Sequence, residues 1–403
     1  MDKNKRLTVW LPVIIAASIA LGIFIGNHYL SISQGKKRSY SSGNKINAIL
    51  DIIDEQYVDT VSMSKLVEST IPKIFSELDP HSVYIPAEDA SVVNEELEGS
   101  FSGIGVSFNM QTDTILVISV ISGGPAEKAG LLPFDRIISI NDSIFSGKKK
   151  NQGEIMKTLR GAKNSTVKLG VQRGNSPELL YFDVTRGDVP VNSVDVSFEA
   201  AKGIGYIKVS KFARNTYNEF ITAIAKLKQA GCTSFVIDLR GNTGGYMDAA
   251  INMINEFMPE GRLIVYTEGK SFPRSDVYAN GTGTCKDAPI VVLTDEISAS
   301  ASEIFSGAIQ DNDRGTIIGR RTYGKGLVQT QMSLSDGSEM RLTIARYYTP
   351  SGRCIQKKYE MGNTDAYDQD IYNRYMHGEF DSADSIKMDD SLKYQTVGGR
   401  TVY

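Results

Sequence analysis

The stretch IVVLTDEISASASE, residues 290–303, passes from an apolar run into a turn of small residues. Ile290 to Leu293 has the composition of a buried strand, and Ala301 to Gln310 has that of a helix. A turn between the two exposes Ser300 at the helix N-terminus, where backbone N–H groups have no intrahelical partner. The stretch therefore predicts an α/β fold with an accessible serine at the start of a helix.

The same strand–helix alternation extends over the second half of the chain. From Gly203 onward we expect strands at 204–209, 234–239, 264–266 and 290–293, and helices at 217–230, 247–257 and 301–310. Alternation of this kind is typical of a parallel sheet with crossover helices.

Lys325 is the second informative residue, because it lies 25 positions after Ser300 in the segment RTYGKG, residues 321–326. A lysine in apolar surroundings loses its proton more readily, and the neutral amine can act as the base for a serine. The chain has only three histidines, none of them near Ser300 in sequence, so lysine is the better candidate for a base. The spacing by itself leaves two other interpretations open, a helix-capping serine and a solvated loop lysine.

A phosphate-binding loop is a competing interpretation of the lysine segment. Residues 319–326, GRRTYGKG, nearly fit the pattern GxxxxGK[ST]. Gly326 has no hydroxyl group for a magnesium ion, and the residues that follow predict a strand instead of a helix. The segment therefore disfavours nucleotide binding.

The composition is that of an ordinary globular protein. The chain has 403 residues, of which 41% are hydrophobic and 23% charged, and this length predicts two or three domains. The net charge of −3 implies no nucleic-acid partner. Cys232, Cys285 and Cys354 have no metal-binding spacing, and we expect neither a metal nor an organic cofactor.

The N-terminus has the pattern of a membrane anchor. Lys3, Lys5 and Arg6 precede a stretch without charges from Leu7 to Gly26, and about 20 such residues suffice to span a bilayer. No A-x-A-like cleavage site follows, which favours an uncleaved transmembrane helix over a cleaved signal peptide, although the latter stays open. The basic flank predicts a cytoplasmic N-terminus and a catalytic part outside the cytoplasm, on the periplasmic or cell-envelope side.

Several further motifs stand in a fixed order along the chain. They are LDPHS (78–82), SGIGV (102–106), GPAEKAGL (124–131) and DLRGNTGG (238–245), followed by the serine and lysine segments. Together they resemble the C-terminal processing peptidases, or tail-specific proteases, a family of serine peptidases that carry a PDZ domain. The resemblance runs from about Ile46 to Gln356, and Thr243 stands where the family commonly has proline.

The resemblance implies an α/β, crotonase-like peptidase core with an inserted PDZ domain, a small N-terminal helical region and the N-terminal transmembrane helix. The expected segments are the anchor at 1–26, a linker at 27–45, the helical region at 46–86, the PDZ domain at 87–187, the peptidase core at 188–362, and an acidic polar insertion with an incomplete C-terminal segment at 363–403.

The resemblance also implies roles for individual residues of the peptidase core. Ser300 is expected to be the nucleophile and Lys325 its base, while the amide of Gln329 holds the lysine amine. The backbone N–H groups of Ala301 and Gly244 are expected to stabilise the oxyanion. His81 is expected to be structural rather than catalytic.

The glycine loop of the PDZ domain is expected to recognise the substrate. Gly103, Ile104, Gly105 and Val106 would present backbone N–H groups to the C-terminal carboxylate of a bound peptide. The implied function is a serine-type endopeptidase that forms an acyl-enzyme and acts on proteins or peptides with free C-termini. Further partners are the membrane, through the N-terminal helix, and a second copy in a possible homo-oligomer. The alternative is a catalytically inactive PDZ scaffold or adaptor on the same fold.

Overall fold

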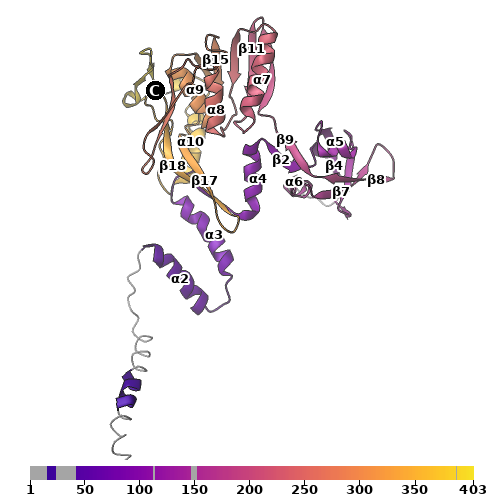
Figure 1. Cartoon of the computed structure of the whole chain (residues 1–403), viewed down its shortest axis with the longest axis vertical. Helices are drawn as coiled ribbons and strands as arrows, with labels where there is room; N and C mark the ends of the chain where they lie inside the picture. Colours follow the sequence, from indigo (N-terminus) through magenta and orange to yellow (C-terminus); the bar gives the residue numbers. More distant parts are fainter. Residues whose placement is uncertain (1–15, 24–41, 112–113, 147–151, 387) are drawn as a thin grey trace, which may run out of the picture. The chain divides into compact units, whose positions relative to one another are not determined.

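The computed structural model describes residues 16–23, 42–111, 114–146, 152–386 and 388–403 (Figure 1). The chain divides into two units, Met1–Thr70 and Ile71–Tyr403. The first unit contains a helical stretch at 16–23 and the helix α2 (Ser42–Gln56), and α3 (Met63–Ser76) begins in it. The fold that positions the site lies in the second unit.

The predicted transmembrane helix is wrong for the residues that the structure describes. Within those ranges no helix is long and apolar enough to cross a membrane. Of the predicted span from Leu7 to Gly26, residues 16–23 are described as helix, and the remaining residues lie outside the described ranges. The fold class is therefore corrected to a mixed α/β fold without this helix.

The region expected to be a PDZ domain forms a sheet with its own hydrophobic core. The sheet has the order β3-β4-β5-β7-β8, with β6 paired to β5. Its strands are β3 (Val106–Gln111), β4 (Thr114–Val120), β5 (Arg136–Ile140), β6 (Ser143–Ile144), β7 (Thr166–Gln172) and β8 (Leu179–Thr185). The helices α5 (Pro125–Ala129) and α6 (Gln152–Leu159) contribute Ala126 and Ile155 to the core.

The chain enters and leaves this domain through one antiparallel ribbon. After α4 (Ala87–Glu98), β2 (Ser100–Gly103) pairs with β9 (Gly187–Pro190), and Ser100 stands opposite Pro190. The two ends of the domain are therefore hydrogen-bonded neighbours, as expected for an insertion into a larger fold.

The first sheet of the remaining part is mostly parallel and carries the larger core. Its order is β10-β11-β12-β15-β16, in which only β10 runs antiparallel to its neighbour. The strands are β10 (Val194–Ala201), β11 (Ile204–Val209), β12 (Ser234–Asp238), β15 (Ile290–Thr294) and β16 (Thr316–Gly319). The helices α7 (Thr216–Gln229), α8 (Met247–Asn255) and α9 (Ala301–Asp311) bury Phe220, Met253 and Phe305 in that core. The predicted alternation is thus confirmed for this sheet.

A second, antiparallel sheet departs from the expectation. It has the order β1-β18-β13-β14, with β17 paired to β18. Its strands are β1 (Val83–Ile85), β13 (Leu263–Glu268), β14 (Ser275–Tyr278), β17 (Leu327–Ser333) and β18 (Glu339–Tyr348). The residues 264–266, predicted to join the parallel sheet, lie in β13 of this second sheet. Alternation along the chain does not specify which sheet a strand joins, so the sequence could not separate the two.

The residues after the second sheet also have a defined structure. They form α10 (Thr364–Met376), two 3₁₀ turns (Ala383–Ser385 and Asp390–Leu392) and a small ribbon of β19 (Tyr394–Gln395) and β20 (Thr401–Val402). Tyr367 and Arg374 of α10 are each only 4% exposed. The polar composition of this segment therefore did not predict that α10 packs against the fold.

Candidate active site

Ser300 lies where the sequence places it, between β15 and α9. It is the N-cap residue of α9, with φ 56° and ψ −113°. A positive φ is unusual for a residue other than glycine, and conformations of this kind cost about 1–3 kcal/mol and are concentrated at functional sites. The predicted strand–turn–helix unit is confirmed, and its strain lies at the predicted nucleophile.

Glu303 connects the serine segment to the lysine segment. Its carboxylate is buried, with 4% of the residue exposed, and its Oε2 accepts the backbone N–H groups of Ser300 and Lys325, each at 2.8 Å. Its Oε1 accepts the N–H of Gly324 at 2.6 Å. Burial raises the pKa of Glu303, and these hydrogen bonds act against that rise. Segments more than 20 residues apart thus meet at one side chain.

The sequence prediction missed Glu303, although a signal was present. Ser300 and Glu303 have the S-x-x-E spacing of a capping box, in which the glutamate accepts the N-cap N–H.

Lys325 lies in a segment without regular secondary structure, residues 321–326, which we call the lysine loop. Burial lowers the pKa of Lys325 from its ordinary 10.5, and the charge of Arg341 lowers it further. Glu303 and Asp79 act in the opposite direction. A lysine with a lowered pKa holds more of the neutral amine that a base requires.

Gln329 lies on β17, but its amide has a different partner from the predicted one. Its Nε2 donates to the backbone carbonyl of His81. Within the described ranges no hydrogen bond joins Gln329 to the amine of Lys325, and its role in holding that amine stays a prediction.

His81 lies beside the lysine in a half-buried polar cluster. Its Nε2 is 2.9 Å from the hydroxyl of Tyr367, and its backbone N–H donates to Asp79 at 3.0 Å. Burial, together with the positive charge of Lys325, lowers the pKa of His81 to about 4. The ring is therefore neutral near pH 7, as a structural histidine should be.

Gly244 approaches Ser300 more closely than any other residue type could. It has φ 102°, and a Cβ atom built on it would lie 2.7 Å from the Cβ of Ser300 and 3.1 Å from the backbone nitrogen of Ala301. The structure thus brings together the nucleophile and both predicted oxyanion donors. The N–H of Gly244, however, donates to Oδ1 of Asn242 at 2.8 Å. Only Ala301, at the positive end of the α9 dipole, offers a donor that these contacts leave unused.

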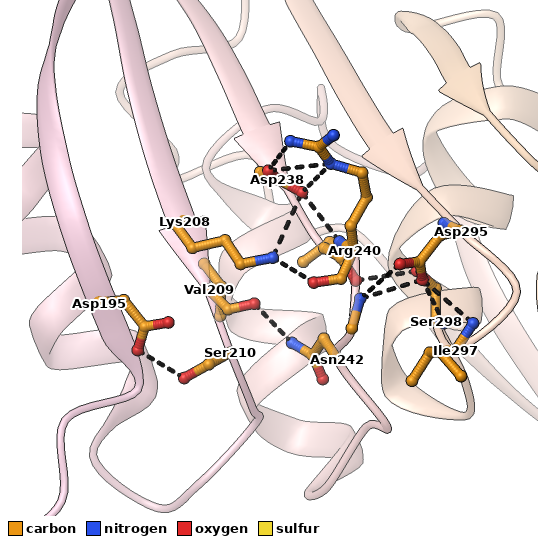
Figure 2. Close-up of polar contacts among 12 residues, drawn as sticks. Asp195, Lys208, Val209, Ser210, Asp238, Arg240, Asn242, Asp295, Ile297 and Ser298 are labelled. Atoms are coloured by element: carbon orange, nitrogen blue, oxygen red, sulfur yellow. Dashed lines mark hydrogen bonds and ion pairs between the residues drawn. The ribbon is translucent and has the colours of Figure 1, made fainter.

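The loop that carries Gly244 is fixed to the serine segment by three side chains, of which Asp295 and Ser298 are labelled in Figure 2. Asp295 accepts the N–H of Gly241, and the hydroxyl of Ser298 donates to the carbonyl of Leu239 at 2.8 Å. Ser302 donates to the carbonyl of Asn242 at 3.0 Å. Ser298 and Ser302 therefore hold the two loops in register.

Asp238 forms a second polar centre at the end of β12 (Figure 2). It is 1% exposed and accepts from the hydroxyl of Tyr206 and from Nη2 of Arg240, both at 2.6 Å, with Nζ of Lys208 at 3.5 Å. Burial acts to raise the pKa of Asp238, but the bonds from Arg240 and Tyr206 outweigh it and lower the pKa to about 2. This ion cluster fixes the start of the loop that leads to Gly244.

The predicted carboxylate loop joins β2 to β3. Gly105 has φ 78°, and its carbonyl accepts the N–H of Ile121, while the carbonyl of Ile104 accepts that of Ala126. The Ile104 side chain lies in the core of the domain and is 3% exposed. These backbone bonds occupy carbonyl groups, and the binding role of Gly103 to Val106 stays a prediction.

Comparison with known proteins gives two family matches. Residues 203–365 match the model of peptidase family S41, and residues 102–195 match that of the PDZ domain. The chain is 35% identical over 318 residues to "Carboxy-terminal processing protease CtpB" of Bacillus subtilis, which covers 78% of the chain and 66% of that protein. It is 33% identical over 365 residues to "Probable CtpA-like serine protease" of Staphylococcus aureus, covering 89% of the chain and 72% of that protein. Among solved structures, the "Photosystem II D1 C-terminal processing protease" is 28% identical, with a TM-score of 0.44 over 79% of this chain and 91% of that one.

Proposed function

This chain belongs to peptidase family S41, as a serine-type C-terminal processing protease with a PDZ domain, and we propose that Ser300 and Lys325 are its catalytic dyad. One observation carries the assignment. The buried carboxylate of Glu303 bonds the backbone N–H groups of both residues and so fixes the nucleophile and the base to one point. The relatives give no support to the alternative of an inactive scaffold.

The reaction follows from the roles of the two side chains. The Oγ of Ser300 attacks the peptide carbonyl carbon, and the neutral amine of Lys325 takes the hydroxyl proton. The tetrahedral intermediate carries its negative charge beside the N–H of Ala301. When it collapses, the C–N bond breaks, the leaving amine takes the proton from Lys325, and an ester to Ser300 remains. Lys325 then takes a proton from a water molecule, whose oxygen attacks the ester carbon. The ester C–O bond breaks, the Oγ of Ser300 takes the proton back from Lys325, and the new carboxylic acid leaves.

Gly244 is the proposed second oxyanion donor. Its N–H is bonded to Asn242 in this structure, so the donor becomes available only when that bond opens. The support is its closeness to Ser300, which leaves no room for a side chain between them.

The PDZ domain is proposed to select substrates by their free C-terminus. The support is the loop Gly103 to Val106, whose two glycines allow a peptide carboxylate to approach the backbone. Protein or peptide substrates fit the family as a whole, and the free carboxylate is the finer proposal.

The catalytic part is proposed to work outside the cytoplasm. The support is the basic residues Lys3, Lys5 and Arg6 before a stretch without charges, a pattern typical of exported proteins. A C-terminal reporter enzyme that is active only after export should be active when fused to the chain. Activity of a cytoplasmic reporter alone would refute this location.

A fluorophosphonate probe tests the dyad directly, because it reacts with activated serines only. The wild-type chain should be labelled, and Ser300→Ala and Lys325→Ala should each be unlabelled while keeping the wild-type melting temperature. Because the two residues act as a unit, the double variant should retain about as much residual peptidase activity as either single variant. Labelling that persists in Lys325→Ala would remove lysine from the mechanism.

A further inference from the structure

The lysine loop has no regular secondary structure, and backbone and side-chain contacts hold it together. Three backbone bonds attach it: the N–H of Tyr323 donates to the carbonyl of Ser298 at 3.0 Å, and the carbonyls of Gly324 and Gly326 accept the N–H groups of Lys357 and Tyr347. Residues 321–326 belong to no helix or strand, and Gly324 has φ 87°, a conformation that glycine adopts without strain. Glu303 holds the loop from the side of α9. The contacts on its other side come from α10 and the residues just before it.

Arg374 of α10 binds the first half of the loop. Its guanidinium donates from Nη1 to the carbonyl of Thr322 at 3.0 Å and from Nη2 to that of Arg321 at 2.5 Å. Its Nε donates to Glu379 at 3.2 Å, and Glu379 also accepts from the side chain of Arg321 at 2.8 Å. A buried cation is unfavourable unless its donors are bonded, and here all three kinds of nitrogen have partners.

Tyr367, also on α10, reaches the second half of the loop through a relay. Its hydroxyl accepts from Nε2 of Gln356 at 3.2 Å, and Oε1 of Gln356 accepts the N–H of Gly326 at 2.9 Å. The same hydroxyl is bonded to His81. The residue after Lys325 is therefore tied to the helix that also binds residues 321 and 322.

We propose that α10 positions the catalytic base, with Arg374 and Tyr367 as its positioning residues. The proposal rests on the Ser300–Lys325 dyad. Arg374 bonds the loop three residues before Lys325, and the relay from Tyr367 bonds it one residue after. Both residues contact the lysine loop, and we assign them an action through the place and the dryness of the lysine amine. A displacement of about 1 Å at a reacting group can lower a rate on the order of 100-fold.

The pH profile of the reaction separates this role from a merely structural one. Lys325 is faced by Arg341 of β18, Glu303 of α9, and Asp79 and His81 near β1. None of these charges changes in Arg374→Met or Tyr367→Phe. Arg374→Met deletes the charge of Arg374 itself, whereas Tyr367→Phe changes no charge, so a shift that both variants share reports a change in the burial or position of the lysine.

The experiment measures the rate of Ser300 labelling by a fluorophosphonate probe against pH in the full chain. Arg374→Met keeps the side-chain volume and removes the donors. We expect a 10- to 100-fold lower rate at neutral pH, and a midpoint that moves up toward the ordinary lysine value. Tyr367→Phe removes only the hydroxyl and should shift the midpoint in the same direction by less.

Arg314→Met is the matched control. Arg314 is half-buried and likewise donates to backbone carbonyls, those of Phe257, Cys285 and Ala288, and none of these belongs to the lysine loop. Its loss should lower the melting temperature and leave the midpoint of the profile in place.

The profiles of these three variants decide whether α10 positions Lys325. If Arg374→Met does not fold, Tyr367→Phe carries the test alone. An unchanged profile in the folded variants, or an equal shift in Arg314→Met, would overturn the positioning role while the dyad stands. Labelling that no longer needs Lys325 would instead overturn the dyad.

Discussion

At the scale of single residues, Glu303 has two tasks that the sequence does not separate. It completes the N-terminal cap of α9, and it holds the backbone of the base. A glutamine has one acceptor oxygen in place of two, and its NH₂ group would face N–H donors. We expect Glu303→Gln to lower the free energy of unfolding by about 1–3 kcal/mol, and to lower kcat about 10- to 100-fold.

Urea unfolding and turnover of a peptide substrate measure these two effects. Glu296→Gln is a suitable control, because Glu296 is bonded to Arg320 near the surface of the same turn. Full activity of a folded Glu303→Gln variant would show that the carboxylate is not needed to place the base.

The lowered pKa of Lys325 predicts how activity depends on pH. A lysine base works only when neutral, and a lowered pKa makes the neutral form available at lower pH. We expect kcat/KM to rise with pH through one ionisation whose midpoint lies below 10.5. A profile that is flat from pH 6 to pH 10, measured with a substrate that does not titrate there, would contradict a lysine base.

Asp238 predicts a contribution to acid stability. Its pKa is about 2 when folded, against 3.8 ordinarily, so the folded state favours the ionised form. Stability from this group is fully present above about pH 4 and is lost as the pH falls toward 2, in total about 2 kcal/mol. Urea midpoints between pH 5 and pH 2.5 should fall less steeply in Asp238→Asn than in the wild type. Equal slopes would show that the cluster does not depress this pKa.

Residues of the site were predicted well where a motif names them and poorly where only packing does. Ser300, Ala301 and Gly244 do lie together. Glu303 was missed because a buried carboxylate is recognised by the groups that surround it in space, and these come from segments far apart in the sequence.

At the scale of elements, the loop after β12 depends on Gly244 having no side chain. Gly244→Ala would place a methyl group 2.7 Å from both the Cβ of Ser300 and the carbonyl oxygen of Ala299. We expect a loss of probe labelling on the order of 100-fold or more, because the serine and its oxyanion donors must separate.

Gly241→Ala is the control in the same loop. Gly241 also has a positive φ, 73°, but a Cβ there would meet no atom within 4 Å. We expect Gly241→Ala to lower the free energy of unfolding by only about 1 kcal/mol. Its rate of probe labelling should equal that of the wild type. Similar labelling of the two variants would mean that the close approach at Gly244 is not required.

The elements themselves show where the sequence is informative. The run 290–293 and the helix that follows it were predicted because both the period and the turn residues agree. The strand β13 was assigned to the wrong sheet, because its pairing with β18 joins residues about 80 positions apart in sequence. The packing of α10 was missed because Tyr367 and Arg374 lie in an otherwise polar segment.

At the scale of the whole molecule, the PDZ domain is expected to make turnover depend on the substrate's own terminus. A peptide with a free C-terminal carboxylate and an apolar last residue should be cleaved faster than its amidated twin. Gly105→Leu should abolish that difference, because Gly105 has φ 78° and borders Pro125. The variant should still react with the small probe at Ser300.

Gly174→Ala controls for a glycine of positive φ elsewhere in the domain. It has φ 60° with no neighbouring atom within 4 Å, and it should keep the preference for the acid. Equal cleavage of acid and amide by the wild type, across several tail sequences, would refute selection by the C-terminus.

The ribbon of β2 and β9 has one more consequence, for how such proteins are built. Because Ser100 stands opposite Pro190, both ends of the intervening domain leave the fold about 5 Å apart. The ribbon of β2 and β9 should tolerate replacement of the domain between them, provided that the two ends of the new domain lie equally close together. Recombination could therefore exchange the recognition module as a cassette, and a chimera made at this junction could direct an unaltered catalytic core to new tails.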